Sequence, residues 1–371
     1  MAEYEALMPG LPDDIALHCI ARVPHRFHPA LRRVCCRWRD LFPSPIFGRL
    51  RRTIGAEEDL IFLVQAAVPS AGDPDEQLIK PINAGDLRPP LCAVSVCSAG
   101  DGCWRRVVTP EPIPTFAQCA AVDGKLVLVG GWNPETLEPV AGVWVLDLAT
   151  GEWRAGRPMS AARSFFACAA VGGRVFVAGG HDGSKNALRT AEAYDVVADE
   201  WTALPAMAEE RDECKGVGIG GKFWVVSGYG TERQGRFDSA AECYDPASGK
   251  WLKEEGVWPE EGSSPATCFA GVGRGGLWCV GRQGIREYRG GERRWREEAP
   301  AEGVKRGCCA VAIGGGTVAD TVFMMGVAGE EDVGNSGYGG WVAEIGSGKW
   351  RRIETPAMFS GFAYSTSAVR I

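Results

Sequence analysis

The sequence is poor in several features that identify whole classes of protein. Only 4 of its 371 residues are histidine, and 40 basic side chains stand against 47 acidic ones, a net charge of −7. No apolar run approaches the ~20 residues that a membrane-spanning helix needs. A pI near 5.4 argues against a nucleic-acid-binding domain, which normally carries a basic face. The composition therefore favours neither a membrane protein nor a nucleic-acid binder.

Targeting and zinc-binding patterns are missing as well. The opening residues MAEYEALMPG lack the basic and apolar regions of a secretory signal. No pair of cysteines has the C-x-x-C spacing of common zinc sites. We therefore expect an intracellular protein, cytoplasmic and/or nuclear, whose 14 cysteines are reduced thiols.

Glycine and tryptophan, by contrast, are abundant and occur in a repeat. There are 50 glycines and 13 tryptophans, and after residue 50 a pattern recurs with a period of about 50 residues. Apolar segments ending in glycine, such as KLVLVGG and RVFVAGG, precede an apolar run that leads to Asp, a polar turn and Trp. Each period predicts four short strands whose Trp packs between neighbouring sheets. The recurring tryptophans are Trp104, Trp153, Trp201, Trp251, Trp295 and Trp350.

These ordered markers resemble kelch repeats, and the resemblance implies a β-propeller. The first unit has candidate second and third strands at 60–65 and 91–96 but no first strand. The last segment, GFAYSTSAVRI at 361–371, has the character of that missing strand. We expect residues 51–371 to form six blades, the first of which is closed by the C-terminal strand.

The first fifty residues have a different pattern. Pro12, Asp13 and Asp14 are typical of a helix start, and Pro24 ends that helix. Apolar residues from Leu31 to Leu41 at helical spacing predict a further helix, and IFGRLRR predicts a final helical turn. So few residues bury little apolar surface alone, and we expect a partner to cover them.

This segment resembles an F-box, with LP at 11–12, VP at 23–24 and LRRVCCRW at 31–38. The expected fold is thus an all-β six-bladed kelch β-propeller (51–371) preceded by a small all-α F-box helical domain (1–50). The resemblance implies binding to a Skp-type adaptor, and through it to a cullin, in an SCF ubiquitin ligase. The implied adaptor-binding residues are Leu11, Pro12, Ile15, Val23, Pro24, Leu31, Val34 and Trp38. The alternative is a helical hairpin that simply packs on the propeller.

Some propellers are enzymes, but the residues here argue against catalysis. Three of the four histidines lie in the F-box segment, so His181 is left without the partners of a multi-histidine metal centre. The segment HDGSKN offers a His–Asp pair but no accompanying nucleophile motif. Four cysteines occupy the same position in the expected inner strands of their blades, where we expect packing and not reactivity: Cys119, Cys168, Cys214 and Cys308. We expect no catalytic residue, no metal and no cofactor.

The loops provide a candidate substrate-binding rim. In a propeller, the loops between second and third strands share one face with the connections between blades. Arginine and aromatic residues, which are enriched at interface hot spots, concentrate in these loops. The candidates are Trp132, Arg163, His181, Lys185, Arg211, Tyr229, Arg233, Arg236 and Arg282. The alternative for any one arginine is an ion pair that bridges to an acidic neighbour within the fold.

Several phrases between residues 155 and 250 resemble one plant group of F-box/kelch proteins, among them RSFFACA, VFVAGGHDGSKNAL and KFWVVSGYGTERQGRF. Members of that group deliver phenylalanine ammonia-lyase to the ubiquitin–proteasome system and so restrain phenylpropanoid synthesis. Close relatives act on type-B response regulators of cytokinin signalling or on chalcone synthase. The implied function is a non-catalytic substrate receptor; a kelch scaffold without a role in degradation is the alternative from another class.

Overall fold

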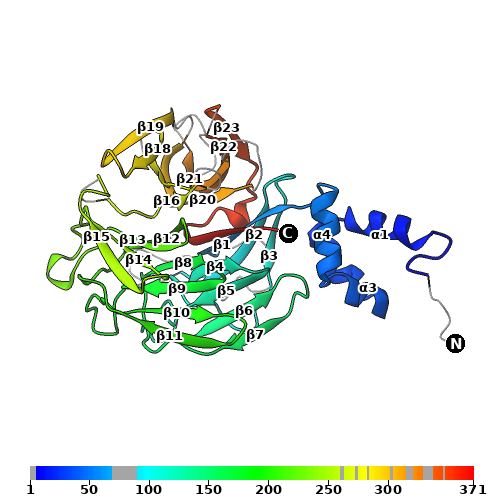
Figure 1. The fold of residues 1–371 in the computed structure, drawn as a ribbon, viewed down its shortest axis with the longest axis horizontal. Helices are drawn as coiled ribbons and strands as arrows, with labels where there is room; N and C mark the ends of the chain where they lie inside the picture. Colours follow the sequence, from blue (N-terminus) through cyan, green and yellow to red (C-terminus); the bar gives the residue numbers. More distant parts are fainter. Residues whose placement is uncertain are drawn as a thin grey trace.

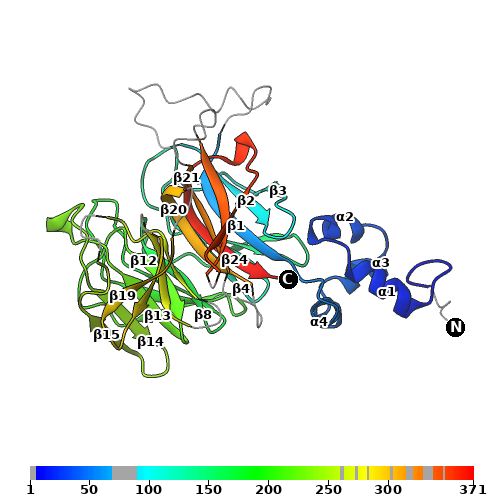
Figure 2. The same ribbon diagram turned by 90° about the horizontal axis from the view of Figure 1, so that it is seen from above.

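The computed structural model describes residues 6–68, 90–259, 263–271, 275–281, 284–300, 304–314, 321–328, 337–345 and 347–371, with the backbone alone at 304–306. It has two parts, a helical segment and a ring of six four-stranded sheets (Figure 1). The helical segment projects from one side of the ring in both ribbon views (Figure 2). No helix in these ranges is long and apolar enough to cross a membrane.

The helical segment contains four α-helices and one 3-10 turn. They are α1 (Asp13–Ala21), η1 (His25–Phe27), α2 (His28–Leu31), α3 (Cys36–Leu41) and α4 (Pro45–Thr53). The predicted first and last helices are confirmed, and Pro12 is the N-cap of α1. Ser44 caps α4 by accepting a hydrogen bond from the Phe47 amide at 3.3 Å. A small core joins these helices: Leu7, Ala16, Ile20, Ala21, Phe42 and Phe47.

The expected helical stripe from Leu31 to Leu41 is interrupted, so this part of the prediction is wrong. Helix α2 ends at Leu31, and Cys35 is extended, with φ −157° and ψ 169°, before α3 begins. Valine and cysteine are poor helix formers, which weakens the segment at Val34 and Cys35. The preceding Arg32 donates from its guanidinium to the Thr150 carbonyl of the propeller, a contact that holds the end of α2.

Each sheet of the ring is a blade of four antiparallel strands. Blade 1 comprises β24 (Ala363–Arg370), β1 (Asp59–Ala66), β2 (Cys92–Ser98) and β3 (Trp104–Val107). Blade 2 comprises β4 (Gln118–Val122), β5 (Lys125–Val129), β6 (Val143–Asp147) and β7 (Trp153–Gly156). Blade 3 comprises β8 (Ala167–Val171), β9 (Arg174–Ala178), β10 (Ala191–Asp195) and β11 (Glu200–Leu204).

The other three blades follow the same order. Blade 4 comprises β12 (Lys215–Ile219), β13 (Lys222–Val226), β14 (Ala241–Asp245) and β15 (Lys250–Glu254). Blade 5 comprises β16 (Cys268–Ala270), β17 (Leu277–Gly281), β18 (Gly284–Arg289) and β19 (Arg294–Pro300). Blade 6 comprises β20 (Val304–Ile313), β21 (Thr321–Ala328), β22 (Tyr338–Glu344) and β23 (Lys349–Ile353). Short helical turns occur at η2 (Thr231–Arg233) and η3 (Ala357–Phe359).

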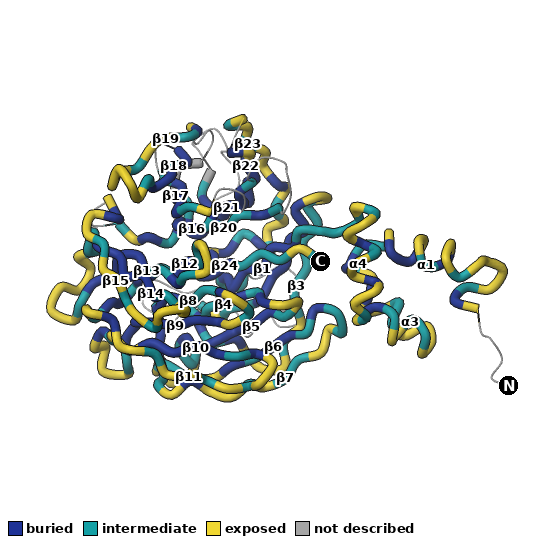
Figure 3. The backbone as a smooth tube through the Cα atoms, in the orientation of Figure 1, coloured by how far each residue is buried: buried dark blue, intermediate teal, exposed yellow. Residues whose placement is uncertain are grey.

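The C-terminal strand closes the ring, as the sequence predicts. Strand β24 pairs with β1, placing Leu60 opposite Val369 and Leu63 opposite Thr366. The first strand of each blade lies at the axis, where β24, β4, β8, β12, β16 and β20 contact one another in a closed circle. The two ends of the propeller sequence are thus joined in one sheet. Figure 3 shows the buried residues concentrated along the strands of the blades.

The recurring tryptophans connect neighbouring blades through their indole N–H groups. Trp201 donates to the Arg157 carbonyl at 2.7 Å, and Trp153 donates to the Val108 carbonyl at 2.8 Å. In both cases the acceptor follows the outer strand of the preceding blade. Trp104, Trp251, Trp295 and Trp350 make the same kind of bond. The predicted packing of Trp between sheets is therefore confirmed in all six blades.

Candidate functional site

An apolar surface lies on the exposed side of the F-box helices. Leu11, Ile15 and Val34 are 39%, 48% and 61% exposed, and Pro12 beside them is exposed as well. The core of the helical segment has only six buried residues and does not cover these side chains. We call Leu11, Pro12, Ile15 and Val34 the apolar F-box surface. It is available to a partner without any rearrangement of the helices.

The other four predicted adaptor contacts are less accessible. Leu31 and Trp38 pack against the F-box core, and the Trp38 indole donates to the Leu7 carbonyl at 2.8 Å. Val23 and Pro24 are half-buried, and the Val23 carbonyl accepts from Arg51 at 2.9 Å. In the described structure, these residues hold the helices in place beneath the apolar F-box surface.

Polar contacts fix the F-box helices to the propeller. The His25 ring binds the Leu148 carbonyl through Nε2 at 2.8 Å, and Arg26 pairs with Asp101. Arg51, which is buried, pairs with Glu58 at 3.0 Å just before β1. Burial lowers the pKa of His25 to about 4. The ring is therefore neutral at physiological pH, which suits its buried position.

The F-box and the candidate rim lie at opposite ends of the strands. Leu148 and Asp101 belong to turns between the third and fourth strands of blades 2 and 1. The candidate rim residues of blades 2 and 3 lie in the β5–β6 and β9–β10 loops. These loops join β6 and β10 at the opposite ends of those strands. A molecule bound at the rim would therefore not compete with the contacts that hold the F-box.

The expectation that Arg163 and Arg211 present their side chains at the rim is wrong. Each is only 1% exposed. Arg163 pairs with buried Glu192 at 3.3 Å, and Arg211 pairs with buried Glu242 at 3.1 Å. Both arginines also donate to backbone carbonyls of the blade they begin. These residues lock the connection between blades, which is the alternative that the sequence left open.

His181 lies in a saturated hydrogen-bond network. Its Nδ1 is 2.9 Å from the Asp212 carboxylate, and its Nε2 accepts from the Trp132 indole at 3.2 Å. This arrangement places the proton on Nδ1, so the acceptor nitrogen is already occupied. The partner is Asp212 and not the adjacent Asp182, which binds amides of its own loop. Through the His181 ring, this geometry joins blades 2, 3 and 4.

The remaining rim candidates differ in accessibility. Lys185 is exposed, and its ammonium lies 4.0 Å from the centre of the half-buried Trp132 ring. Arg233 and Arg236 are exposed in and after η2. Tyr229 is buried, and its hydroxyl donates to Glu213 at 2.8 Å. Arg282 lies outside the described residues.

The structure also reveals an axial cavity that the sequence did not indicate. It has a volume of about 270 Å³, and blades 1 to 6 all contribute to its lining, with Phe116, Phe165 and Tyr364 supplying aromatic walls. Phe116 and Phe165 have left-handed backbones, with φ of 64° and 55°, and Glu213 at the equivalent place in blade 4 has φ 49°. Such φ values are costly for residues with a side chain and concentrate at functional sites.

The cavity combines an aromatic surface with two charged groups. The rings of Phe116 and Phe165 are 4.3 Å apart, and Phe116 meets Tyr364 edge-on at 4.9 Å. Burial raises the pKa of the Glu213 carboxyl despite its bond from Tyr229. Lys215 lines the same cavity. Such a lining can contact a protruding side chain, and burial raises the pKa of the adjacent Cys214 thiol to about 12.

No metal-binding group of three or more suitable side chains occurs among the residues that the structure describes. All fourteen cysteines are free thiols.

Comparison with known proteins agrees with this architecture. The F-box domain model matches residues 8–50, and the kelch motif model matches residues 114–160 and 162–208. The F-box/kelch-repeat protein At2g44130 of Arabidopsis thaliana is 38% identical over 98% of this chain and 96% of its own. The chain belongs to the plant F-box/kelch-repeat proteins. A second Arabidopsis member, F-box/kelch-repeat protein SKIP20, is 39% identical over 98% of this chain and 97% of its own.

A solved structure supports the fold of the propeller. The structure described as "Structure of YjhT" superposes with a TM-score of 0.56 and covers 71% of this F-box/kelch-repeat chain and 91% of its own. Its sequence identity of 13% makes it a likeness of fold alone. The two kelch-motif matches lie in blades 2 and 3.

Proposed function

We propose that this F-box/kelch-repeat protein is the substrate-recognition subunit of an SCF-type ubiquitin ligase. The observation that carries the proposal is the apolar F-box surface, where Leu11, Ile15 and Val34 are well exposed beside a core too small to cover them. A Skp-type adaptor, and through it a cullin, would bury this surface. Removing apolar surface from water favours such an association by roughly 25 cal/mol per Å².

The role of the propeller in this proposal is to hold a target protein on the face that carries the axial cavity and the exposed Lys185, Arg233 and Arg236. His25, Arg32 and Arg51 connect the F-box firmly to the ring. A rigid link keeps the target at a fixed place relative to the ubiquitin-charged enzyme. Ubiquitin transfer then gains from effective concentration, and no chemical step needs to occur on this chain.

Phenylalanine ammonia-lyase is our proposed target, with restraint of phenylpropanoid synthesis as the consequence. The support is the resemblance of residues between 155 and 250 to the plant group that acts on this enzyme. Type-B response regulators and chalcone synthase are the alternative targets. Action in the cytoplasm, the nucleus or both is part of the same proposal.

A reconstituted ligase tests the proposal. The full chain, bound to its adaptor and cullin, is mixed with purified phenylalanine ammonia-lyase, and ubiquitin conjugates on the target are measured. A charge-reversed rim variant, Arg233→Glu/Arg236→Glu, is expected to lower conjugation. Its matched control is Lys250→Glu/Lys349→Glu, which reverses two exposed charges at the other ends of the strands and should leave conjugation unchanged.

The outcomes separate the parts of the proposal. Adaptor binding without conjugation of this enzyme would overturn the target and direct the assay to response regulators and chalcone synthase. A chain that binds no Skp-type adaptor would overturn the ligase role and favour a scaffold. Equal loss in the rim variant and its control would contradict the assignment of the binding face.

A further inference from the structure

Blades 3 and 4 each contain a buried socket for a guanidinium group. In blade 3, Arg163 Nη1 donates to the Gly179 and Thr190 carbonyls, both at 3.0 Å, while Nη2 reaches Glu192. In blade 4, Arg211 Nη1 donates to the carbonyls of Ser227 and Ala240, and its Nε donates to Glu242. The socket is therefore two backbone carbonyls and a carboxylate, repeated in successive blades.

Backbone pairing identifies the equivalent positions in blade 2. The isolated bridges Thr115–Trp132, Ser164–His181 and Asp212–Tyr229 occupy the same place in blades 2, 3 and 4. The residue before each bridge is Pro114, Arg163 or Arg211, so proline stands in blade 2 where the other two have arginine. The third strands can be aligned in the same way, by their pairing with the second strand of each blade. Strand β6 then has Trp144 at the position where β10 has Glu192 and β14 has Glu242. Both members of the ion pair are thus replaced in blade 2.

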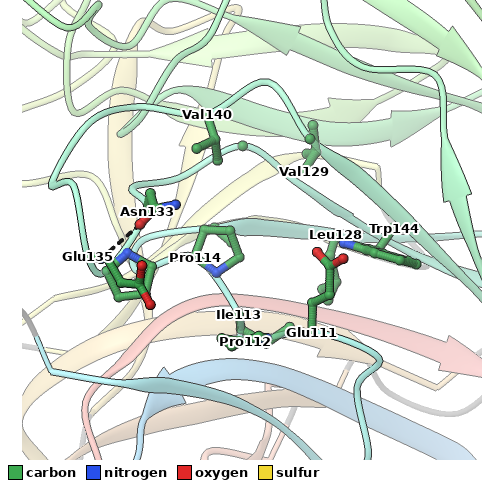
Figure 4. A pocket seen from close by; sticks show the side chains of 14 residues that line it. Glu111, Pro112, Ile113, Pro114, Leu128, Val129, Asn133, Glu135, Val140 and Trp144 are labelled. Atoms are coloured by element: carbon green, nitrogen blue, oxygen red, sulfur yellow. Dashed lines mark hydrogen bonds between the residues drawn. The ribbon is translucent and has the colours of Figure 1, made fainter.

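A cavity of about 320 Å³ lies at these replaced positions. Pro114, Trp144, Gly130 and Gly142 all line it, with apolar walls from Ile113, Leu128, Val129 and Val140 (Figure 4). Gly130 and Gly142 are the counterparts of Gly179 and Thr190, because the Gly130 amide bonds to the Gly142 carbonyl as the Gly179 amide bonds to that of Thr190. The two residues whose carbonyls hold arginine elsewhere therefore line an open cavity here.

The surroundings of this cavity favour a cation. The side chains of Glu111 and Glu135, which are exposed, lie among the lining residues (Figure 4). Neither carboxylate forms an ion pair with any residue in the described ranges. The half-buried indole of Trp144 supplies a flat apolar surface on which a guanidinium can stack. The apolar walls suit the methylene stem of a long basic side chain.

We propose that the blade 2 cavity binds an arginine side chain contributed by a protein partner. The incoming guanidinium takes the place that Arg163 and Arg211 take in blades 3 and 4, donating to the carbonyls of Gly130 and Gly142. Trp144 stands where blades 3 and 4 have the carboxylate, and its indole stacks on the guanidinium. Glu111 and Glu135 attract the positive charge of the guanidinium. This inference rests on the proposed function, because the partner that contributes the arginine is taken to be the target protein held by the propeller.

Direct binding of a small probe tests the site. The full chain in complex with its adaptor is titrated with N-acetyl-arginine amide and with its neutral isostere N-acetyl-citrulline amide, and binding is followed by ligand-observed NMR. The arginine probe is expected to bind about tenfold or more tightly, because citrulline lacks the positive charge that strengthens the hydrogen bonds and the cation–π contact. Lysine amide should bind more weakly than arginine amide, since its ammonium lacks the planar fork.

The repeat itself supplies the decisive variant. Pro114→Arg/Trp144→Glu rebuilds the internal ion pair of blades 3 and 4 and should abolish probe binding while the melting temperature is kept or raised. Glu111→Gln/Glu135→Gln should weaken binding without changing the fold. Its matched control, Glu152→Gln/Glu200→Gln, neutralises two exposed carboxylates at the opposite ends of the strands and should bind the probe as the natural sequence does.

Three results would overturn the inference: no binding of the arginine probe at millimolar concentration, equal binding of arginine and citrulline, or unchanged binding in both cavity variants. Adaptor binding is measured on the same samples. Loss of probe binding with the adaptor still bound would remove this site alone, whereas loss of adaptor binding would count against the proposed function and leave the cavity result standing.

Discussion

Replacement of Arg163 by methionine tests whether this residue is structural, as its surroundings indicate. The guanidinium donates to the Gly179 and Thr190 carbonyls, to the Thr190 hydroxyl and to Glu192. Methionine fills much of the same space but offers none of these bonds. Among the described residues, the buried Glu192 then keeps only its bond from the Ser160 amide at 3.1 Å.

The expected loss of stability follows from the buried carboxylate. Breaking one side of a buried ion pair typically costs about 3–5 kcal/mol, because the remaining charge is uncompensated. For a propeller of this size that corresponds to a fall of about 5 °C in Tm. Arg163→Met/Glu192→Leu removes both charges and should be less destabilised than the single variant, by about 1 kcal/mol or more.

Thermal denaturation of the full chain provides the assay. The matched control is Arg174→Met in the same blade, where a partly exposed arginine meets Asp195 at 3.5 Å and a surface pair contributes about 0–1 kcal/mol. If Arg163→Met were as mild as Arg174→Met, the structural role would be refuted. Loss of target binding at unchanged Tm would instead restore Arg163 to the binding rim.

Three further predictions concern stability. Burial holds the pKa of His25 near 4 and that of His28 near 3, so the unfolded chain binds more protons than the folded chain below pH 6.5. The contribution of the two neutral histidines to the free energy of unfolding is therefore present above pH 6.5 and falls as the pH drops toward 4. His25 alone accounts for about 3 kcal/mol, and a Tm that stays constant from pH 7 to 5 would contradict this. Trp201→Phe loses the bond to Arg157 and should cost about 1 kcal/mol in urea denaturation; an unchanged midpoint would argue against the indole link. Deletion of 361–371 removes β24 from the centre of the ring and should abolish cooperative unfolding, and a soluble, cooperatively unfolding product would be incompatible with closure by this strand.

The periodicity of the sequence was sufficient to predict the propeller. Each repeat contains a buried apolar strand, a glycine turn and an indole that must reach the preceding blade, so local chemistry and global fold agree. Gly180 illustrates the constraint: its φ is +79°, and a Cβ there would lie 2.3 Å from the Ser164 carbonyl oxygen. The closing strand was also predictable, because one blade lacked its first strand and the chain ended with a suitable one.

Register within the inner strands could not be read from the repeat alone. Cys119 and Cys168 occupy equivalent positions opposite Leu128 and Val177. In blade 4, however, Gly216 takes that position opposite Val225, and Cys214 precedes the strand. A Cβ at Gly216 would lie 2.4 Å from the Cys168 amide nitrogen. Close approach of two blades therefore decides the residue, and the expectation that Cys214 shares this strand position is wrong. The expectation is wrong for Cys308 as well, because Ala310, opposite Met324, takes the position in blade 6.

The candidate site was harder to predict for a physical reason. A sequence shows that a loop contains arginine but not whether a carboxylate from a later strand meets it, and Glu192 is 29 residues beyond Arg163. The same holds for His181 and Asp212. One signal was available in the sequence. The third strands of blades 3 and 4, AEAYD and AECYD, share a glutamate that VWVLD in blade 2 lacks. The segments that lead into blades 3 and 4, MSAAR and MAEER, likewise end in an arginine that PEPIP before blade 2 lacks. That paired loss in blade 2 points to the open cavity.

Binding of the purified full chain to a Skp-type adaptor tests the central claim most directly. Calorimetry should show a stable complex for the natural sequence, and Ile15→Asp/Val34→Asp should weaken it by at least about a hundredfold, since two apolar contacts of 1.5–3 kcal/mol each are lost. Val197→Asp, at a propeller residue that is 83% exposed, serves as the matched control and should bind normally. Undiminished affinity in Ile15→Asp/Val34→Asp would contradict the account.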